Sequence, residues 1–78
     1  MGAGTVSVFL KEGVHDPEGE KVKESLRLLG IDRVTRVRVG KLYRIELEDA
    51  TTEKIDEICA VLLVNPVIEC HEIMEIEG

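Results

Sequence analysis

The stretch R-V-T-R-V-R-V-G-K-L-Y-R-I-E-L-E, from Arg33 to Glu48, decides the fold that we predict for this chain. It reads as a strand, a tight turn at Gly40 and Lys41, and a returning strand. The apolar residues of each strand share one parity: Val37 and Val39 in the first, and Tyr43, Ile45 and Leu47 in the second. A period of two is typical of half-buried strands, so we predict an antiparallel pair with one face in the core.

A loop of three residues, 40–42, sets the register of this predicted hairpin. The apolar pairs are then Val39 with Tyr43 and Val37 with Ile45. A loop of two residues would place Val37 opposite Arg44 instead, so we reject it.

The polar face of the hairpin carries an excess of positive charge. Its pairs are Arg36 with Glu46 and Arg38 with Arg44. Arg38 and Arg44 are alike in charge, which is unfavourable in directly opposed positions. The formal net charge of the whole protein is −6. Three arginines gathered on one face of an acidic protein indicate an acidic or anionic neighbour.

Two helices and two further strands flank the hairpin in the predicted order. Thr5 to Lys11 alternates as a first strand, with Phe9 pointing away from the core. Asp16 and Pro17 begin a helix that runs to about Leu29, with the apolar stripe Val22, Leu26 and Leu29 and a stop at Gly30. A second helix begins near Thr51 or Thr52, and its inward face is Ile55, Ile58, Cys59 and Leu62.

The end of the chain holds a helix stop and a last strand. The second helix finishes in the apolar run Val61 to Val64, which is either a buried end or a patch for a partner, and Asn65-Pro66 stops it. Val67 to Glu77 forms the last strand, in which the apolar residues change parity. A bulge or burial on both faces accounts for that change.

The order strand, helix, strand, strand, helix, strand predicts an α+β, ferredoxin-like split β-α-β fold in a single domain of residues 1–78. We expect an antiparallel sheet with both helices on one face. The other face is then free for association, and it bears Phe9, Arg36, Arg38, Arg44 and Glu46.

Length and composition restrict the function classes. A chain of 78 residues is close to the size below which a core alone gives little stability, so we expect at least a dimer and leave open a tetramer of paired dimers. The two halves of the chain differ in charge: residues 1–39 carry +1 and residues 40–78 carry −7. This balance argues against nucleic acid or membrane as the main partner. The sequence has no membrane-length apolar run and no leader pattern, so we expect a cytoplasmic protein.

Catalytic and metal-binding patterns are missing from the sequence. It has no Gly-rich phosphate loop, no nucleophile elbow and no histidine pair at helical spacing, so we predict no catalytic, cofactor-binding or metal-binding residue. Cys70 and His71 are adjacent on a strand and point to opposite faces, which argues against zinc. An RNA-recognition-like domain would share the strand order, but Phe9 and Tyr43 have opposite parity here.

Three segments resemble a known family. L-K-E-G-V-H-D-P-E-G (Leu10 to Gly19), V-R-V-G-K (Val37 to Lys41) and N-P-V-I-E (Asn65 to Glu69) resemble the PurS family, whose members are the small accessory subunits of phosphoribosylformylglycinamidine synthase in purine biosynthesis. The resemblance spans almost the whole chain in the right order. Cys70-His71 departs from it, because Asp-Tyr is common there, and this puts contacts of those side chains in doubt.

The resemblance implies a dimeric, noncatalytic subunit of a glutamine-dependent, ATP-dependent ligase. Such a subunit joins a glutaminase subunit to the synthase subunit and assists ammonia transfer between them, while ATP and magnesium are bound by the large subunit. Candidate contact residues for these partners are Phe9, Arg36, Arg38, Lys41, Arg44, Asn65 and Pro66. A ferredoxin-like module that binds a small metabolite is the alternative, and an RNA-recognition-like domain is a weaker one.

Overall fold

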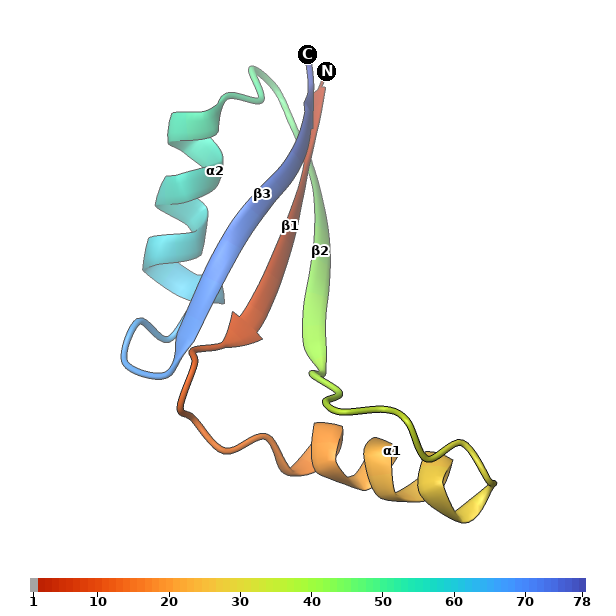
Figure 1. Cartoon of the computed structure of the whole chain (residues 1–78). Coiled ribbons are helices and arrows are strands. Elements are labelled where there is room, and N and C mark those ends of the chain that lie inside the picture. Colours follow the sequence, from red (N-terminus) through yellow and green to blue (C-terminus); the bar gives the residue numbers. More distant parts are fainter. Residues whose placement is uncertain (1) are drawn as a thin grey trace.

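The computed structural model describes residues 2–78, and its elements follow the order strand, helix, strand, helix, strand. The elements are β1 (Gly2–Leu10), α1 (Pro17–Leu28), β2 (Gly40–Leu47), α2 (Thr52–Ile58), a π-helical turn (Cys59–Leu63) and β3 (Glu69–Glu77). The fold is therefore α+β, as the hydrophobic pattern predicts. Figure 1 shows two parts: the sheet with α2 beside it, and α1 projecting away from them.

The sheet is antiparallel, with the order β2-β1-β3. β1 lies in the centre, and the two chain ends lie close together at one end of the sheet (Figure 1). A β-bulge interrupts the pairing of β1 with β3 between Thr5 and Val6. The bulge confirms the predicted phase break, because it lets Ile73 and Ile76, three positions apart, both pack against the core.

The core lies between one face of the sheet and α2. Its fully buried members are Val6 and Val8 from β1, and Ile55 and Cys59 from the second helix. Thr51 caps α2 by accepting a hydrogen bond from the Lys54 amide at 3.2 Å, which confirms the predicted start of this helix. Gly4 lies beneath α2, and a Cβ there would lie 2.6 Å from Ile55 Cδ1, so a larger residue would displace the Ile55 side chain.

The end of the second helix differs from its prediction. The wider π-helical turn at Cys59–Leu63 replaces the last α-helical turn, so the expected spacing of the inward face fails after Cys59. Leu62 was expected inside the core, but it is 79% exposed. Val61 beside it is equally exposed, whereas Leu63 and Val64 are partly buried and pack against the core. The first half of the apolar run is therefore an exposed patch, and the second half is a buried end.

The predicted strand over residues 33–39 and the turn at Gly40 and Lys41 are wrong. Residues 31–39 run as an extended segment outside the sheet, and Gly40 already pairs with Phe9 of β1. Lys41 and Leu42 pair with Val8 and Ser7, so the chain enters β2 without reversing. Because Gly40, Lys41 and Leu42 pair with β1, they cannot form the loop of the predicted hairpin.

The placement of α1 also differs from the prediction. Asp16 caps the helix and Pro17 begins it, as expected, and Gly30 after its end has a positive φ of 88°. However, Gly19 is the only buried residue of α1, so its apolar stripe covers no part of the sheet. Both helices therefore do not share one face of the sheet within a single chain, and the molecule is elongated, 47 × 25 × 14 Å.

Candidate subunit interface

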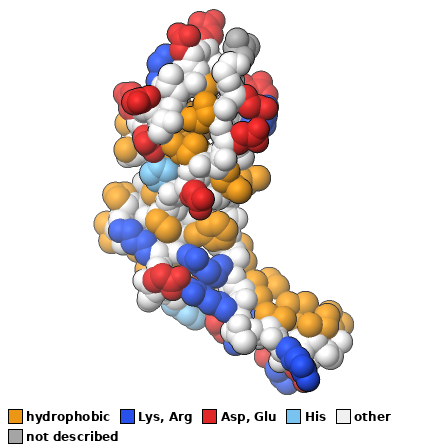
Figure 2. All heavy atoms as spheres, turned by 45° about the horizontal axis from the view of Figure 1, so that its top comes forward, with side chains coloured by type: hydrophobic (Ala, Val, Ile, Leu, Met, Phe, Trp, Pro, Cys, Tyr) orange, Lys and Arg blue, Asp and Glu red, His pale blue; other side chains and the backbone are white. Residues whose placement is uncertain are grey.

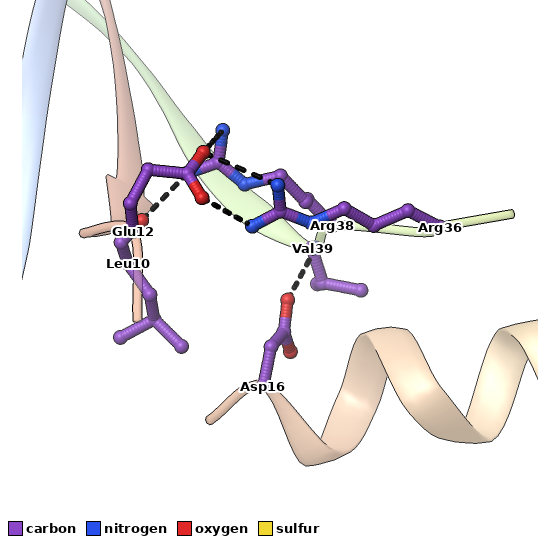
Figure 3. Close-up of polar contacts among 6 residues, drawn as sticks. All are labelled: Leu10, Glu12, Asp16, Arg36, Arg38 and Val39. Atoms are coloured by element: carbon purple, nitrogen blue, oxygen red, sulfur yellow. Dashed lines mark hydrogen bonds and ion pairs between the residues drawn. The ribbon is translucent and has the colours of Figure 1, made fainter. Parts of the chain in front are cut away.

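Glu12 joins the two arginines of the extended segment. Its carboxylate lies 3.0 Å from Arg36 Nη2 and 3.7 Å from Arg38 Nη1 (Figure 3). The hydrogen bond from Arg36 lowers the pKa of Glu12. All three side chains are at least one-third exposed, so these ion pairs orient the arginines more than they stabilise the fold.

Arg38 makes two further contacts with β1. Its Nη2 donates a hydrogen bond to the Leu10 carbonyl oxygen at 2.6 Å. Its guanidinium carbon lies 5.2 Å from the centroid of the Phe9 ring, which is within the range of a cation–π contact. Phe9 and Arg38 thus meet at the end of the sheet although the expected hairpin is absent.

Asp16 holds the start of α1 against the end of the extended segment. Its Oδ1 accepts from the Gly19 amide and its Oδ2 accepts from the Val39 amide, both at 2.9 Å. Figure 3 shows the second bond between the helix and the segment. The two backbone bonds, Val39 first, lower the pKa of Asp16 because they stabilise its charged form.

Gly19 permits the close approach of α1 to this segment. A Cβ at Gly19 would lie 2.1 Å from the Val37 carbonyl oxygen, a separation that no side chain tolerates. Only glycine fits between the helix and the backbone at this point.

Lys41, Asn65 and Pro66 lie near the same end of the sheet. Lys41 Nζ is 3.9 Å from Glu69, the first residue of β3. Asn65 organises the turn before β3, since its side-chain oxygen accepts from the Val67 amide at 3.1 Å and its carbonyl oxygen accepts from Glu69 N at 2.8 Å. Exposed apolar side chains flank this turn: Val61, Leu62 and Val67.

Arg44 stands apart from the other candidates. It pairs with Thr5 in the middle of β1, and its guanidinium contacts Glu77 at 2.8 Å and Glu46 at 3.8 Å. Its pKa is raised by the Glu77 hydrogen bond. The structure thus gathers Phe9, Arg36, Arg38, Lys41, Asn65 and Pro66 toward one end of the sheet, next to the projecting α1, and leaves Arg44 outside.

The sequence prediction missed the acidic partners of these cations. It paired Arg36 with Glu46 across a hairpin. In the structure Arg36 forms an ion pair with Glu12, and Arg44 forms one with Glu77. Glu12 lies two residues after the end of β1, so the signal for its role was its nearness in sequence to Phe9 and Leu10 at the end of the central strand. We overlooked this signal because the predicted hairpin register already paired Arg36 with Glu46.

The metal-ligating, nucleophilic and membrane features of residues 2–78 can be described one by one. No three His, Cys, Asp or Glu side chains of these residues stand where they could hold a metal ion together. Burial raises the pKa of the Cys59 thiol, and this suits a core side chain better than a nucleophile. His71 Nε2 lies 3.0 Å from Asp56, which links β3 to α2. No helix in residues 2–78 is both long and apolar enough to cross a membrane.

Comparison with known proteins places this chain in a family. The family model described as "PurS: Phosphoribosylformylglycinamidine (FGAM) synthase" matches residues 3–77. The PurS subunit of Archaeoglobus fulgidus is 47% identical over an alignment of 73 residues, and the match covers 88% of this chain and 91% of that protein. The PurS subunit of Methanocaldococcus jannaschii is 39% identical, with 94% and 93% covered.

Solved structures agree with the sequence relatives. The crystal structure of M. jannaschii PurS, described as one of the subunits of formylglycinamide ribonucleotide amidotransferase, has a TM-score of 0.88 at 37% identity and covers 100% of this chain and 98% of that one. The PurLQS structure from Thermotoga maritima has a TM-score of 0.77 at 32% identity and covers 100% of both chains. We conclude that the chain belongs to the PurS family, the PurS subunits of FGAM synthase in purine biosynthesis.

Proposed function

We propose that this chain is the noncatalytic subunit that joins the glutaminase subunit of FGAM synthase to its ATP-dependent synthase subunit. The observation that best supports this proposal is the likeness to a chain of the T. maritima PurLQS structure over the full length of both chains. The name of that structure combines PurL, PurQ and PurS. In this proposal the chain acts as a homodimer within such a complex, in the cytoplasm, while ATP and magnesium bind to the large subunit.

The surface of the chain supports a contact role. One end carries Arg36, Arg38 and Lys41, whereas the second half of the chain is strongly acidic, at −7 for residues 40–78. In Figure 2 most of the visible lysine and arginine side chains lie in the lower half, and most of the visible aspartate and glutamate side chains lie in the upper half. Such separated charge gives two different surfaces for two different subunits.

The proposed role is the coupling of two reactions by ammonia transfer. Ammonia released from glutamine must reach the synthase site without escaping to water, which requires the two larger subunits to be held in a fixed relation. A small, elongated subunit that contacts both would supply that relation. It would contribute to the glutamine-dependent reaction and would matter less when ammonia is supplied directly.

Reconstitution tests this proposal. The two larger subunits are assayed with and without this chain, using glutamine in one series and ammonium chloride in the other. We expect omission to abolish glutamine-dependent synthesis and to leave most of the ammonia-dependent synthesis. Equal loss of both activities would contradict coupling, because it would mean that the chain supports the synthase subunit directly.

A further inference from the structure

An uncharged run of eleven residues extends from Ile58 to Ile68, in a chain of which 33% of the residues are charged. Residues 1–10 form the only other uncharged run of ten or more in the sequence, and they contain the largely buried central strand β1. The run from Ile58 to Ile68 differs, because much of it lies at the surface. It combines the composition of a buried segment with the exposure of a surface segment.

The exposed apolar side chains of this run, which we call the apolar patch, are Val61, Leu62, Val67 and Ile68. The first three are each more than three-quarters exposed. The π-helical turn Cys59–Leu63 accounts for part of this exposure, since it holds Cys59 in the core and leaves the next residues outside. Such turns are frequent at functional sites. Single exposed apolar side chains are ordinary, but several gathered within the stretch 61–68 mark a contact surface.

A hollow of about 240 Å³ adjoins the apolar patch. Its lining residues alternate in sequence with those of the patch and continue into the neighbouring strands: Lys11, Ala60, Val64, Pro66, Glu69 and His71. Three of them are apolar and three carry charged or titratable side chains. The hollow therefore suits an apolar side chain that has a polar group beside it.

Lys11 is the charged group of the hollow that lacks a counter-charge within residues 2–78. The Glu69 carboxylate accepts a hydrogen bond from the Asn65 amide at 2.8 Å and lies 3.9 Å from Lys41 Nζ. His71 is engaged as well, because its Nε2 lies 3.0 Å from an Asp56 carboxylate oxygen. A carboxylate on an incoming chain would thus find its counter-charge at Lys11.

The apolar patch lies next to the cations of the candidate interface. Lys41, one of these cations, forms its ion pair with Glu69 at the border of the hollow. The Lys11 amide donates a hydrogen bond to the Ile68 carbonyl oxygen at 2.8 Å, which joins the end of β1 to the patch. In Figure 1 the loop between α2 and β3 lies at the same end of the sheet as the end of β1 and the start of β2. The patch and the cations therefore belong to one surface.

We propose that the apolar patch is an anchor site for one of the two larger subunits, the same one that the cations Arg36, Arg38 and Lys41 bind. An apolar side chain of that subunit enters the hollow, and a carboxylate beside it pairs with Lys11. The inference rests on the proposed function and adds to it the surface used and the chemistry of the partner. A few buried apolar anchors supply most of the binding energy of an interface, while complementary charges around them select the partner.

A second copy of this chain fits the apolar patch less well. A standard two-fold interface takes about 800 Å² and roughly 20–30 residues from each chain, whereas the patch has four exposed side chains. A two-fold contact centred on the hollow would also bring two copies of Lys11 together, and like charges oppose such a contact. An acidic surface on a different subunit has neither difficulty.

Photo-cross-linking in the assembled complex identifies what covers the patch. p-Benzoylphenylalanine replaces Leu62 in one variant and Met74 in the matched control, which is a 62% exposed apolar position farther along β3. Each variant is irradiated together with the two larger subunits. The probe at position 62 should cross-link to one larger subunit about tenfold or more above the probe at position 74. The same probe in place of Lys41 should cross-link to that same subunit.

Three cross-linking results would overturn the inference. Products joining two copies of this chain would assign the patch to the homodimer, and equal yields from positions 62 and 74 would make it an ordinary surface. Cross-links from positions 62 and 41 to different subunits would separate the patch from the cations. A parent chain that forms no complex with the larger subunits would overturn the proposed function together with the inference, and that result appears before irradiation.

Two glutamine substitutions measure the contribution of the patch to affinity. Leu62→Gln and Met74→Gln both keep the net charge and replace exposed side chains, so both variants should fold. Leu62→Gln should raise the Kd for the cross-linked subunit about tenfold or more and leave the Kd for the other subunit nearly unchanged. Met74→Gln should leave both values nearly unchanged. Equal effects of the two substitutions would overturn the anchor site.

Discussion

The sheet with α2 and the arm formed by α1 with residues 29–39 differ in how they are held. In the first region, Val6, Val8, Ile55 and Cys59 are at most 1% exposed, so apolar burial stabilises it within one chain. The arm has no buried apolar side chain, and Leu28 and Leu29 are more than 70% exposed. Polar contacts from Glu12 and Asp16 hold it instead. The same chain thus contains one region with a buried apolar core and an arm that has none.

Truncation of a core side chain should produce the largest effect on stability. Ile55→Ala should reduce the free energy of unfolding by about 2 to 5 kcal/mol, because it leaves a cavity beneath α2. Chemical denaturation monitored by circular dichroism measures this loss at one protein concentration. Leu28→Ala is the matched control on the exposed arm. A loss of similar size for Leu28→Ala would mean that the arm is packed as tightly as the core.

Substitution of Gly19 should distinguish the arm contact from helix propensity. Alanine favours a helix over glycine by about 1 kcal/mol, so propensity alone predicts a gain in stability for Gly19→Ala. The structure predicts a loss of about 1 to 3 kcal/mol in the local stability of residues 37–39, since the added Cβ would collide with the Val37 carbonyl oxygen. Native-state amide exchange at Val39 reports this local stability. Slower exchange in the variant would contradict the contact.

Reversal of charge at the basic end, the end of the sheet that carries Arg36, Arg38 and Lys41, should weaken assembly of the chain with its partner subunits. Arg38→Glu with Lys41→Glu should leave the circular dichroism spectrum nearly unchanged and weaken binding to the partner subunits about tenfold or more, which corresponds to about 1.4 kcal/mol. The loss should shrink at high salt, because screening weakens binding of the parent protein too. Titration at two ionic strengths measures both effects.

The matched control for this reversal is Lys21→Glu with Arg27→Glu, which makes the same change in net charge on the arm. It should bind the partner subunits nearly as well as the parent. Equal weakening by the two double variants would show that net charge, and not the basic end, determines the affinity.

Acid should release the end of the arm from the start of α1. The pKa of Asp16 is lowered by its bonds to the Val39 and Gly19 amides, so these bonds stabilise the arm above the ordinary value of 3.8. The stabilisation is lost as pH falls through the lowered pKa. The amide shifts of both residues, followed by NMR, should titrate together with a midpoint below 3.8. Asp16→Asn should remove this titration, and a midpoint at or above 3.8 would contradict the two bonds.

Local sequence signals predicted parts of both regions. The alternation of Val6 and Val8, the caps at Asp16 and Thr51 and the phase break before Ile76 each depend on neighbours in sequence, and the structure confirms them. Leu62 was misplaced because a π-helical turn has no distinct hydrophobic period. The spacing around Leu62 fits an ordinary α-helix equally well.

The hairpin failed for a different reason. Alternation identifies residues 33–39 as strand-like but does not say which strand they pair with. Within one chain the pairing of Gly40–Leu42 with β1 removes the loop. The basic end could be predicted in part, because Phe9, Arg36, Arg38 and Lys41 do lie toward one end. The role of Glu12 could not be predicted, because its contacts with Arg36 and Arg38 depend on where the chain places residues 33–39, and the predicted hairpin placed them elsewhere.

Amide hydrogen exchange along the chain tests most directly whether apolar burial separates the two regions. It is measured at low protein concentration, so that association protects neither region. We predict that the amides of Val6 and Val8 in the central strand exchange about tenfold or more slowly than those of α1, because the core must open before they are exposed. Equal protection of α1 and the central strand would contradict this account.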